Sequence, residues 1–391
     1  MRIGFSVLGL LPDTIGGVET YIRGLLTGLA HVDTDNEYVI FTNRDNHATF
    51  DGLGRNFRRV LYDFSAKWNV RSLAMTRLVG EQFYLPYKAA RESIDILHSP
   101  LDTTPLLARC RTVMTLHDLN FDAVPEATTP FRRLMAQGLV KASARRVDAI
   151  VTVSNFSREQ IVLKLGIPAD RVSVTYNAVD PHPAPPPRHD WPGLAARLGI
   201  ARPHVLAFSS LNPHKNIATL IRAFALMNSR ERWQLMVVGH LPTRGKPLSR
   251  LASELELGDS VVFTGYLSRK DLAVALHNAR ALAFPSLYEG FGIPLLEAMS
   301  IGVPVACSNV TALPEVAADA ALFFDPMAPE NMAAAIERVL SDDLVRERLV
   351  AAGHENVKRF SWEQTARRTL EVYRRIMDVA AYRRGSDAEA A

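Results

Sequence analysis

Residues 288–298, YEGFGIPLLEA, decide the fold because they predict a strand end, a glycine turn and a helix start in direct succession. Gly290 and Gly292 predict the turn, and Pro294 suits the first helical turn, where its missing N–H costs nothing. The backbone N–H groups around Gly292 to Leu295 have no acceptor inside the helix. The segment therefore predicts a cradle for an anion at a helix start.

Two glutamates flank this turn, Glu289 on the loop and Glu297 early in the helix. Both would repel a phosphate placed directly against them. They fit an anion that carries hydroxyl groups on both sides, as a sugar–diphosphate–ribose does, because carboxylates accept hydrogen bonds from hydroxyls. The plainer interpretation is that Glu297 complements the helix dipole and Glu289 caps the turn. It explains each acid separately but leaves the glycine turn between them unexplained.

On both sides of this segment, short apolar runs alternate with longer amphipathic ones, a pattern typical of βαβ units. Buried parallel strands are predicted at 2–10 and within EYVIFT, IDILHSP, TVMTLHD, DAIVTVS, VSVTYNA, HVLAFSS, WQLMVVG, SVVFTG, ARALAFPS, GVPVACS and AALFFD. Helices are predicted at 18–30, from Ile217, at 329–340, at 343–360 and from Trp362 to about Ala381, followed by a frayed tail.

A chain of 391 residues exceeds one ordinary hydrophobic core, so two α/β domains are expected. The proline-rich stretch 180–193, DPHPAPPPRHDWPG, can continue neither a sheet nor a helix. We predict a doubly wound domain at 1–180, a linker at 181–203, a second doubly wound domain at 204–368, and a helix and tail at 369–391 that pack back toward the first domain. Such open sheets bind ligands at the carboxyl ends of their strands, which places the predicted site in the crevice between the domains.

The composition, with 48% hydrophobic and 22% charged residues, is that of a globular protein. Its two cysteines, Cys110 and Cys307, favour buried thiols in a reducing cytosol over a disulfide framework. No apolar run reaches the roughly 18 residues that a membrane-spanning helix needs. The apolar start, MRIGFSVLGLLPD, lacks a small-residue cleavage site and is predicted to be a buried strand rather than a signal peptide.

The net charge is only +4, but basic residues gather in two stretches of the first half, 55–77 and 128–147. The second stretch combines five basic residues with Phe131, Leu139 and other apolar side chains, and it contains no acid. Such a segment suits an anionic membrane surface, with a solvated helix face as the alternative. Nucleic acid is the least favoured partner, because the stretches lack the interleaved aromatic residues of a stacking groove.

Two further loops follow predicted strands and precede helices. In LGLLPDTIGGVETY, Gly16 and Gly17 would let the backbone approach a ligand, with a tight turn as the alternative. Neither the G-x-G-x-x-G of a dinucleotide site nor the P-loop pattern is present, which argues against a nicotinamide dehydrogenase. In SSLNPHKN, Lys215 stands at a helix start, where the dipole disfavours a cation unless an anion is bound; an ordinary exposed lysine is the alternative.

These motifs together resemble the retaining glycosyltransferases of family 4, which have the GT-B fold of two Rossmann-like domains facing across a cleft. YEGFGIPLLEAMSIGVPV is similar to the E-x7-E segment of that family and carries the resemblance most strongly. The resemblance covers nearly the whole chain, through GGVETY, LHDLN, VTVSNFSREQI, YNAVD, SLNPHKN, VVFTGYLSRKDL and ALPEVAADAALFFDP.

The resemblance implies roles for the residues of the turn. Glu297 would hold the nucleotide ribose, and Glu289 would contact the donor sugar together with the backbone of Phe291 and Gly292. Backbone amides from Ile293 to Leu295 would bind the diphosphate. Lys215 would neutralise the leaving phosphate, so Glu289 and Lys215 are expected to act in catalysis.

The resemblance also implies roles for residues elsewhere. His117 would line the sugar site from the first domain, as a third catalytic residue, and the loop of Gly16 and Gly17 would approach the phosphates. The alternative for His117, a packed histidine at a strand end, is set aside because of the motif. The segment that would hold the base, largely through its backbone, comprises Val262, Phe263, Gly265 and Tyr266.

In one place the chain departs from the family pattern. Many members carry an arginine just before the lysine or a few residues earlier, where this chain has Ser209, Ser210 and His214. Ser210 and His214 are still expected to line the donor site. Phosphate neutralisation would then rest on Lys215 alone or on protonated His214.

A metal ion is not expected. The D-T-D at 33–35 matches the Asp-x-Asp metal signature of a different glycosyltransferase fold, but its position beside Asn36 favours turn chemistry. The histidines show no metal-ligand spacing, so neither a metal nor another cofactor is predicted.

We therefore expect a cytoplasmic enzyme, with the basic stretches favouring a peripheral position on the inner face of the plasma membrane. It would move a hexose from a nucleotide sugar to a glycan or polyprenyl-diphosphate-linked acceptor in cell-surface polysaccharide synthesis. Resemblance to bacterial O-antigen and exopolysaccharide mannosyltransferases makes GDP-mannose the first expected donor and a UDP-hexose the second. Retention would follow from same-face attack, with the leaving diphosphate taking the proton. A non-catalytic sugar-binding protein of the same fold is the remaining alternative.

Overall fold

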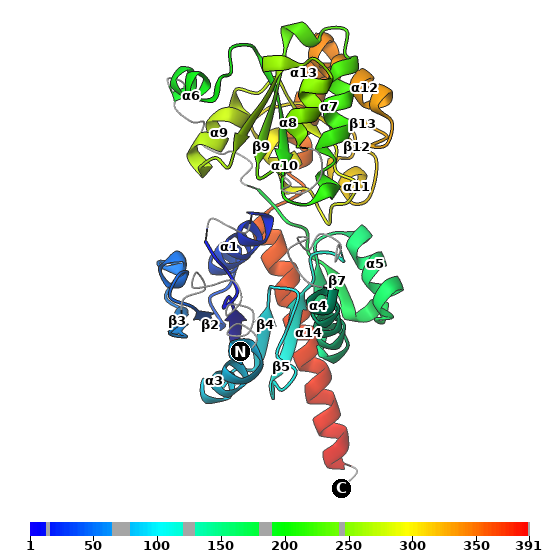
Figure 1. Ribbon diagram of the computed structural model, residues 1–391. Helices are drawn as coiled ribbons and strands as arrows, with labels where there is room; N and C mark the ends of the chain where they lie inside the picture. The colour runs from blue at the N-terminus through cyan, green and yellow to red at the C-terminus, as the bar shows by residue number, and fades with distance from the viewer. Residues whose placement is uncertain (13–15, 65–78, 120–129, 180–189, 242–246, 390–391) are drawn as a thin grey trace. The chain divides into compact units, whose positions relative to one another are not determined.

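The computed structural model describes residues 1–12, 16–64, 79–119, 130–179, 190–241 and 247–389 (Figure 1). Its contacts divide the chain into two compact units. The first unit contains Met1–Leu119, the described residues 130–178 and the chain from Ser361 on. The second unit contains Val179–Phe360. Each unit is built on its own parallel sheet.

The sheet of the first unit has seven parallel strands in the order β3-β2-β1-β4-β5-β6-β7. The strands are β1 (Arg2–Ser6), β2 (Glu37–Thr42), β3 (Phe57–Leu61), β4 (Ile96–Ser99), β5 (Arg111–Thr115), β6 (Ala149–Thr152) and β7 (Val172–Val174). β1 ends before the predicted residue 10, because the chain turns where the Leu10 N–H donates to the Val7 carbonyl. β3 was not predicted, because its segment FRRVL lies at the sheet edge and needs no continuous apolar run.

Helices cover both faces of this sheet. They are α1 (Gly16–Val32), α3 (Leu85–Arg91, which directly follows the π-helical turn η2, Gly80–Tyr84), α4 (Pro130–Arg146), α5 (Asn155–Leu165) and α14 (Trp362–Glu389), with short 3-10 turns η1 (His47–Phe50) and η4 (Ala169–Arg171). α1 and α14 pack in one core cluster with β1, where Leu25 and Tyr373 meet Phe5. α3 covers the opposite face, where Leu85 packs near Phe41.

Two glycines let α14 lie close against α1. A side-chain carbon at Gly24 would overlap the ring of Trp362, and one at Gly28 would overlap the Trp362 backbone carbonyl. A ring can turn aside, but a backbone carbonyl moves only with its helix. The close approach of α1 and α14 therefore depends most on Gly28.

Gly28→Ala is expected to destabilise the first unit by about 1–3 kcal/mol, the usual cost of overpacking. For a unit of this size each kcal/mol lowers Tm by about 2–4 °C, which differential scanning calorimetry resolves. Gly138→Ala in α4 is the matched control, because among the described residues no atom lies within 4 Å of a side-chain carbon there. Equal Tm values for the two variants would contradict the described packing of α14 on α1.

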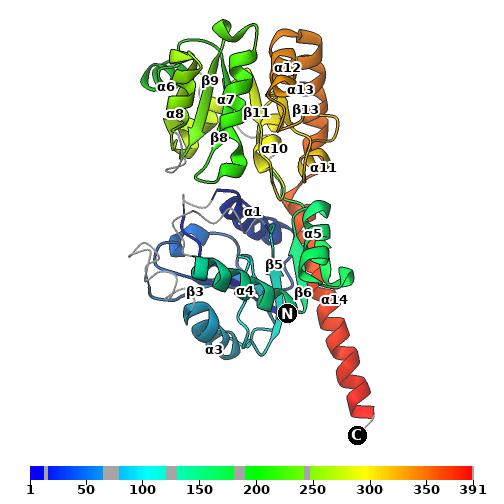
Figure 2. The ribbon, with the colours of Figure 1, turned by 45° about the vertical axis from the view of Figure 1, so that its right-hand side comes forward.

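The sheet of the second unit has six parallel strands in the order β10-β9-β8-β11-β12-β13. Figure 2 labels β8, β9, β11 and β13 of this sheet. The strands are β8 (His204–Ser209), β9 (Gln234–Gly239), β10 (Val261–Gly265), β11 (Ala281–Phe284), β12 (Val305–Ser308) and β13 (Ala321–Phe324). The helices are α6 (Asp190–Leu198), α7 (Ile217–Leu226), α8 (Leu248–Glu254), α9 (Arg269–His277), α10 (Ile293–Ser300), α11 (Leu313–Ala317), α12 (Pro329–Ser341) and α13 (Asp343–Val357), with the 3-10 turns η5 (Pro213–Lys215), η6 (Arg230–Arg232) and η7 (Gly258–Ser260).

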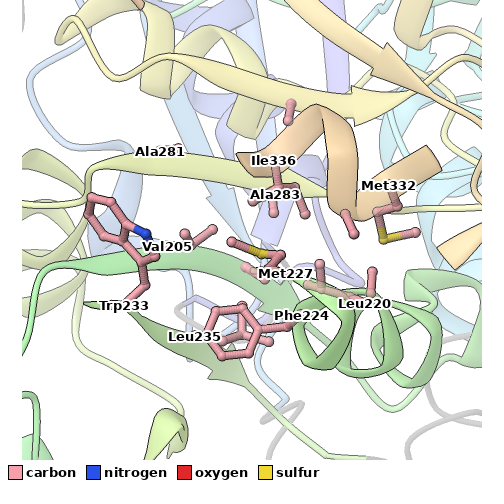
Figure 3. Close-up of a cluster of buried hydrophobic side chains, with 14 of the residues drawn as sticks. Val205, Leu220, Phe224, Met227, Trp233, Leu235, Ala281, Ala283, Met332 and Ile336 are labelled. Atoms are coloured by element: carbon pink, nitrogen blue, oxygen red, sulfur yellow. The ribbon is translucent and has the colours of Figure 1, made fainter. Parts of the chain in front are cut away.

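The core of the second unit lies between its sheet and the helices α7 and α12. Val205 and Ala283 from the strands meet Phe224 of α7 and Ile336 of α12 (Figure 3). Burial on this side and beneath α10 on β11 and β12 explains why these strands are continuous apolar runs. The same packing sets the carboxyl ends of β8 and β11 beside each other, because these strands are neighbours in the sheet.

The unit boundaries differ from the predicted ones. Residues 190–198 form α6 of the second unit rather than a linker, since Trp191 stacks on His204 and Arg197 pairs with Asp271 at 3.0 Å. The chain returns to the first unit at Ser361 rather than at 369, because α14 begins at Trp362. The predicted frayed tail is helical as far as Glu389. The proline run at 180–189 lies outside the described residues.

The basic stretches of the sequence are partly matched by acids in space. Arg58 and Arg59 lie on β3 and pair with Glu92 and Asp51. The second stretch forms α4, on which Lys141 is exposed, while residues 65–78 and 120–129 lie outside the described part of the chain. Among the helices that the structure describes, none has both the length and the apolar character needed to cross a membrane.

Candidate functional site

The segment after β11 forms the predicted strand end, turn and helix. Gly292 caps α10 with φ +99°, and a side-chain carbon there would stand 2.8 Å from Leu313 Cδ2, so backbone and packing both require glycine. The predicted anion cradle has fewer free N–H donors than expected. The Leu295 N–H already donates to the Gly292 carbonyl at 3.0 Å, and Pro294 has no N–H. This leaves the Ile293 N–H as the helix-start donor, for which the described residues offer no acceptor.

The turn itself is well anchored. Gly290 and Phe291 are buried, and the Phe291 ring packs edge-on against Phe360 with ring centroids 5.6 Å apart. Such packing fixes the backbone on which Glu289 and Ile293 stand. A rigid loop is what a preorganised binding site requires.

Lys215 and Glu289 meet at this turn. The Lys215 Nζ donates to Glu289 Oε1 at 2.6 Å, and both side chains are half-buried. Lys215 ends η5 after β8 and Glu289 follows β11, so two neighbouring strands bring the two residues together. The Lys215 Nζ also lies 5.2 Å from the centre of the Phe284 ring. Because an ammonium has three N–H donors, the ion pair leaves Lys215 able to bind an anion as well.

Asn216 holds the loop that carries Lys215, a role that was not predicted. Its backbone is left-handed with φ +56°, and its side chain donates to the carbonyls of Pro285 at 3.1 Å and Pro326 at 2.8 Å. Asparagine tolerates this conformation better than most residues do. The signal in the sequence is therefore an asparagine placed directly between a predicted turn and the helix start at Ile217.

Thr311, in the loop before α11, was also not predicted. Its Oγ1 accepts the Glu289 N–H at 3.2 Å, and its φ of +60° is costly for a β-branched residue. Residues held in such strained conformations often cluster at functional sites. The contact crosses from β12 to β11, so no local pattern around Thr311 reveals it.

Thr311→Ala is expected to lower kcat about five- to tenfold, because an unsatisfied Glu289 N–H costs on the order of 1 kcal/mol and loosens the carboxylate that orients Lys215. Thr311→Ser keeps the acceptor and should restore kcat. Thr311→Gly loses the same acceptor but relieves the strained φ, so its Tm should exceed that of Thr311→Ala while its kcat stays low. Steady-state kinetics and calorimetry measure both effects, and an unchanged kcat in Thr311→Ala would exclude the positioning role.

Glu297 lies on α10, half-buried, and no donor among the described residues is hydrogen-bonded to its carboxylate. Burial raises the pKa of Glu297, and Arg269 at the start of α9 opposes that shift only in part. A carboxylate without a protein donor suits ligand hydroxyl groups. Arg269 was not predicted to take part, although it lies in the VVFTGYLSRKDL motif.

The segment predicted to hold a base is the edge strand β10 and the residue after it. The strand contains the half-buried Val262, its register shifts between Phe263 and Gly265, and Gly265 has φ +71°. The exposed Tyr266 ring stacks on His240, with ring centroids 5.9 Å apart. This aromatic pair at the ends of β9 and β10 offers a flat surface that suits a nucleobase.

The positions where the expected arginine is missing hold residues that shape the loop after β8. Ser209 Oγ donates to the His240 carbonyl at 3.0 Å, and Ser210 Oγ accepts the Asn212 N–H at 3.2 Å. Burial and the charge of Lys215 lower the pKa of His214, against the opposing effect of Glu289. His214 is therefore neutral at neutral pH, which disfavours protonated His214 as the group that neutralises a phosphate.

His117 follows β5 in the first unit. Its Nε2 lies 3.2 Å from the Pro100 carbonyl, which can only accept, so Nε2 carries the proton and Nδ1 keeps a lone pair. Burial lowers the pKa of His117, and the charge of Asp102 opposes that shift. The Tyr21 ring packs edge-on at 4.9 Å. A neutral imidazole with an Nδ1 acceptor suits a sugar hydroxyl.

Gly16 and Gly17 begin α1 rather than the loop before it. No atom of the described residues lies within 4 Å of a side-chain carbon built at Gly16, and its φ is not in the left-handed region. Neither packing nor backbone conformation therefore requires glycine at 16. The predicted role of Gly16 at the donor phosphates stays a prediction.

The D-T-D segment is a turn, as predicted. Asp33 Oδ1 accepts the N–H groups of Asp35 at 3.1 Å and Asn36 at 3.3 Å, and Oδ2 accepts from Tyr38. Burial alone would raise the pKa of Asp33, but these hydrogen bonds outweigh it and lower the pKa. Within the described ranges, no three His, Cys, Asp or Glu side chains are grouped to hold a metal ion. A metal-independent reaction stays a prediction.

Comparison with known proteins gives consistent matches for both halves. Residues 15–182 match the family described as Glycosyltransferase Family 4, and residues 198–356 match the one described as Glycosyl transferases group 1. O-antigen chain mannosyltransferase B of Escherichia coli is 33% identical over 319 residues, which are 81% of this chain and 78% of the relative. The serotype-specific mannosyltransferase WbdA of Escherichia coli is 30% identical over 394 residues, 96% of this chain but 45% of that longer protein.

Among solved structures, Anabaena Alr3699/HepE in complex with UDP and glucose superposes with a TM-score of 0.70 at 20% identity. The superposition covers 95% of this chain and 99% of that one. At this level of identity the similarity concerns the fold.

Proposed function

The chain belongs to glycosyltransferase family 4 and has the GT-B fold, and from this premise we propose that it transfers mannose from GDP-mannose to a lipid-linked glycan, with retention of anomeric configuration. The observation that carries the proposal is the contact of Lys215 with Glu289 at the glycine turn before α10. The contact joins one cation to one carboxylate, and Glu289 belongs to the turn that leads into α10; this combination suits a sugar diphosphate.

In this proposal the donor lies along the carboxyl ends of β8, β10 and β11. The diphosphate takes the remaining N–H donors of Lys215 and the Ile293 amide, where the helix dipole also favours an anion. Glu297 accepts from the ribose hydroxyls, and the base stacks on Tyr266. Glu289 uses Oε1 to orient Lys215 and keeps Oε2 for a hydroxyl of the sugar.

The proposed reaction exchanges one bond at the anomeric carbon. The bond to the leaving diphosphate oxygen breaks while the acceptor hydroxyl oxygen bonds on the same face, and the hydroxyl proton passes to the leaving phosphate. Negative charge grows on the diphosphate, and Lys215 with the Ile293 amide stabilises it. His117 would accept from a sugar hydroxyl through Nδ1. Since Glu289 is already paired with Lys215, it is poorly suited to attack the anomeric carbon itself.

Mannose is proposed because both relatives compared above carry mannosyltransferase in their names and are 33% and 30% identical to this chain. A UDP-hexose is the second candidate donor, favoured by the bound UDP and glucose in Alr3699/HepE. The acceptor is proposed to be polyprenyl-diphosphate-linked, at the inner face of the plasma membrane.

The test is a transfer assay with radiolabelled GDP-mannose or UDP-glucose and a polyprenyl-diphosphate-linked oligosaccharide acceptor, with and without EDTA. We expect label in the lipid fraction only with GDP-mannose, unaffected by EDTA, and a product whose one-bond C1–H1 coupling shows retention. Label from UDP-glucose alone would move the proposal to the second donor. A mannosyl adduct on Glu289→Gln or on wild-type protein, detected by intact mass, would overturn same-face attack.

A further inference from the structure

The helical segment that runs from Val79 through η2 and α3 carries an apolar stripe on its outer face. Val79, Phe83 and Tyr87 are spaced four residues apart and are 44%, 63% and 55% exposed. The inner face of the same segment is buried through Leu85 and Ala89. Residues four apart lie on one face of a helix, so three large apolar side chains point to solvent together.

A loop adds to this stripe. The Gln82 side chain donates to the Thr104 carbonyl at 3.1 Å and accepts the Leu106 N–H at 3.0 Å, which ties the loop after β4 to the helical segment. On that loop Leu107 is 63% exposed. Scattered single apolar residues are normal on a protein surface, but a cluster of this kind marks an interaction site.

The charges beside the stripe are basic. Lys88, Arg91 and Arg109 lie on the same helix and loop, and Lys88 and Arg91 stand over the rings of Tyr84 and Tyr87. The two described acids of this helical segment and its end are already engaged, Glu81 with the Thr103 hydroxyl and Glu92 with Arg58. Aromatic and aliphatic side chains flanked by lysine and arginine are the composition of a helix that lies in a bilayer interface.

We propose that this face, Val79, Phe83, Tyr87 and Leu107 with Lys88, Arg91 and Arg109, docks the protein on an anionic lipid bilayer. This proposal rests on the proposed function, because the polyprenyl-linked acceptor proposed above lies in such a bilayer. Charge complementarity favours lipid over a second copy of the chain. A two-fold contact through this face would set its arginines against one another.

The experiment is cosedimentation of the full chain with sucrose-loaded vesicles. Vesicles of phosphatidylglycerol and phosphatidylethanolamine should bind the wild type, and pure phosphatidylcholine vesicles should bind it far less. Phe83→Ser combined with Tyr87→Ser should weaken binding at least about tenfold, through lost insertion of two aromatic anchors. At low salt, Lys88→Glu combined with Arg91→Glu should weaken vesicle binding more than the aromatic double variant does, because each basic residue contributes about fivefold to binding.

Leu163→Ser and Leu344→Ser are the controls, because these leucines are 76% and 79% exposed but lie on α5 and α13. Circular dichroism should show every variant folded, as the changed side chains point to solvent. Wild type that stays in the supernatant, or Phe83→Ser/Tyr87→Ser binding equal to that of Leu163→Ser, would overturn the proposal. A dimer in light scattering that Phe83→Ser/Tyr87→Ser dissolves would assign the face to a second copy instead.

Vesicle binding needs no nucleotide sugar, so its outcome is independent of donor chemistry. Transfer to a water-soluble acceptor analogue should be unchanged in Phe83→Ser/Tyr87→Ser. Loss of vesicle binding together with normal transfer would therefore assign the defect to the docking surface and not to the donor site. Normal binding without transfer from any donor would count against the proposed function alone.

Discussion

Lys215→Ala is expected to lower kcat by about a hundred- to a thousandfold, the usual effect of removing one donor that stabilises charge developing in a transition state. The reason lies in the geometry of the second unit. Lys215 is the cation at the turn before α10, and His214 beside it is neutral because burial and Lys215 itself lower its pKa. No protonated histidine replaces the lost charge.

The variant also leaves the half-buried Glu289 carboxylate without its partner, so stability and activity must be separated. Calorimetry should show a loss of stability far smaller than the loss in kcat. Lys270→Ala is the matched control, an exposed lysine on α9 of the same unit that pairs with Asp190. It should retain nearly full kcat. If Lys215→Ala also kept kcat within a few-fold of wild type, Lys215 would not be the group that stabilises the leaving diphosphate.

Glu297→Gln is expected to weaken nucleotide binding by about ten- to a hundredfold, because a hydrogen bond to a charged group contributes about 1.5–3 kcal/mol. Glutamine keeps the shape of glutamate but loses the charge that the ribose hydroxyls would meet. Isothermal titration with GDP measures the effect. Glu355→Gln, on the exposed pair with Lys358, is the control and should bind GDP as the wild type does.

Two further measurements sharpen this test. GDP lacking the ribose hydroxyls should bind wild type and Glu297→Gln equally, since the contact in question is then absent from both. In addition, burial raises the pKa of Glu297, so its carboxylate protonates at a higher pH than an ordinary glutamate. GDP affinity of the wild type should therefore begin to fall earlier on acidification than that of Glu297→Gln. Equal GDP affinities at neutral pH would place the ribose elsewhere.

The parts of the fold that the sequence predicts are those in which burial leaves a local pattern. β8, β9 and β11 are continuous apolar runs because both faces of their sheet are covered, and they lie where predicted. β3 has no such signal, because an edge strand tolerates the charged FRRVL. The predicted linker was wrong at α6, because Pro192 was taken to exclude a helix although proline is tolerated in a first helical turn.

The sequence likewise predicts only those parts of the candidate site that lie within one local motif. Gly292, Glu289 and Glu297 stand within one continuous motif, so their turn and helix could be predicted from local chemistry. Thr311 and Asn216 act through contacts between loops that follow different strands, and the hydrophobic periodicity of the sequence does not predict these contacts. The pairing of Lys215 with Glu289 likewise depends on β8 and β11 being neighbours, a fact of sheet order.

Isothermal titration of the wild type with GDP, UDP and NAD, each with and without EDTA, tests the central claim most directly. GDP should bind most tightly, EDTA should leave its affinity unchanged, and Lys215→Ala should lose much of that affinity. NAD binding without GDP or UDP binding, or nucleotide binding that EDTA abolishes and Lys215→Ala does not affect, would contradict a metal-independent donor site built on Lys215 and the turn before α10.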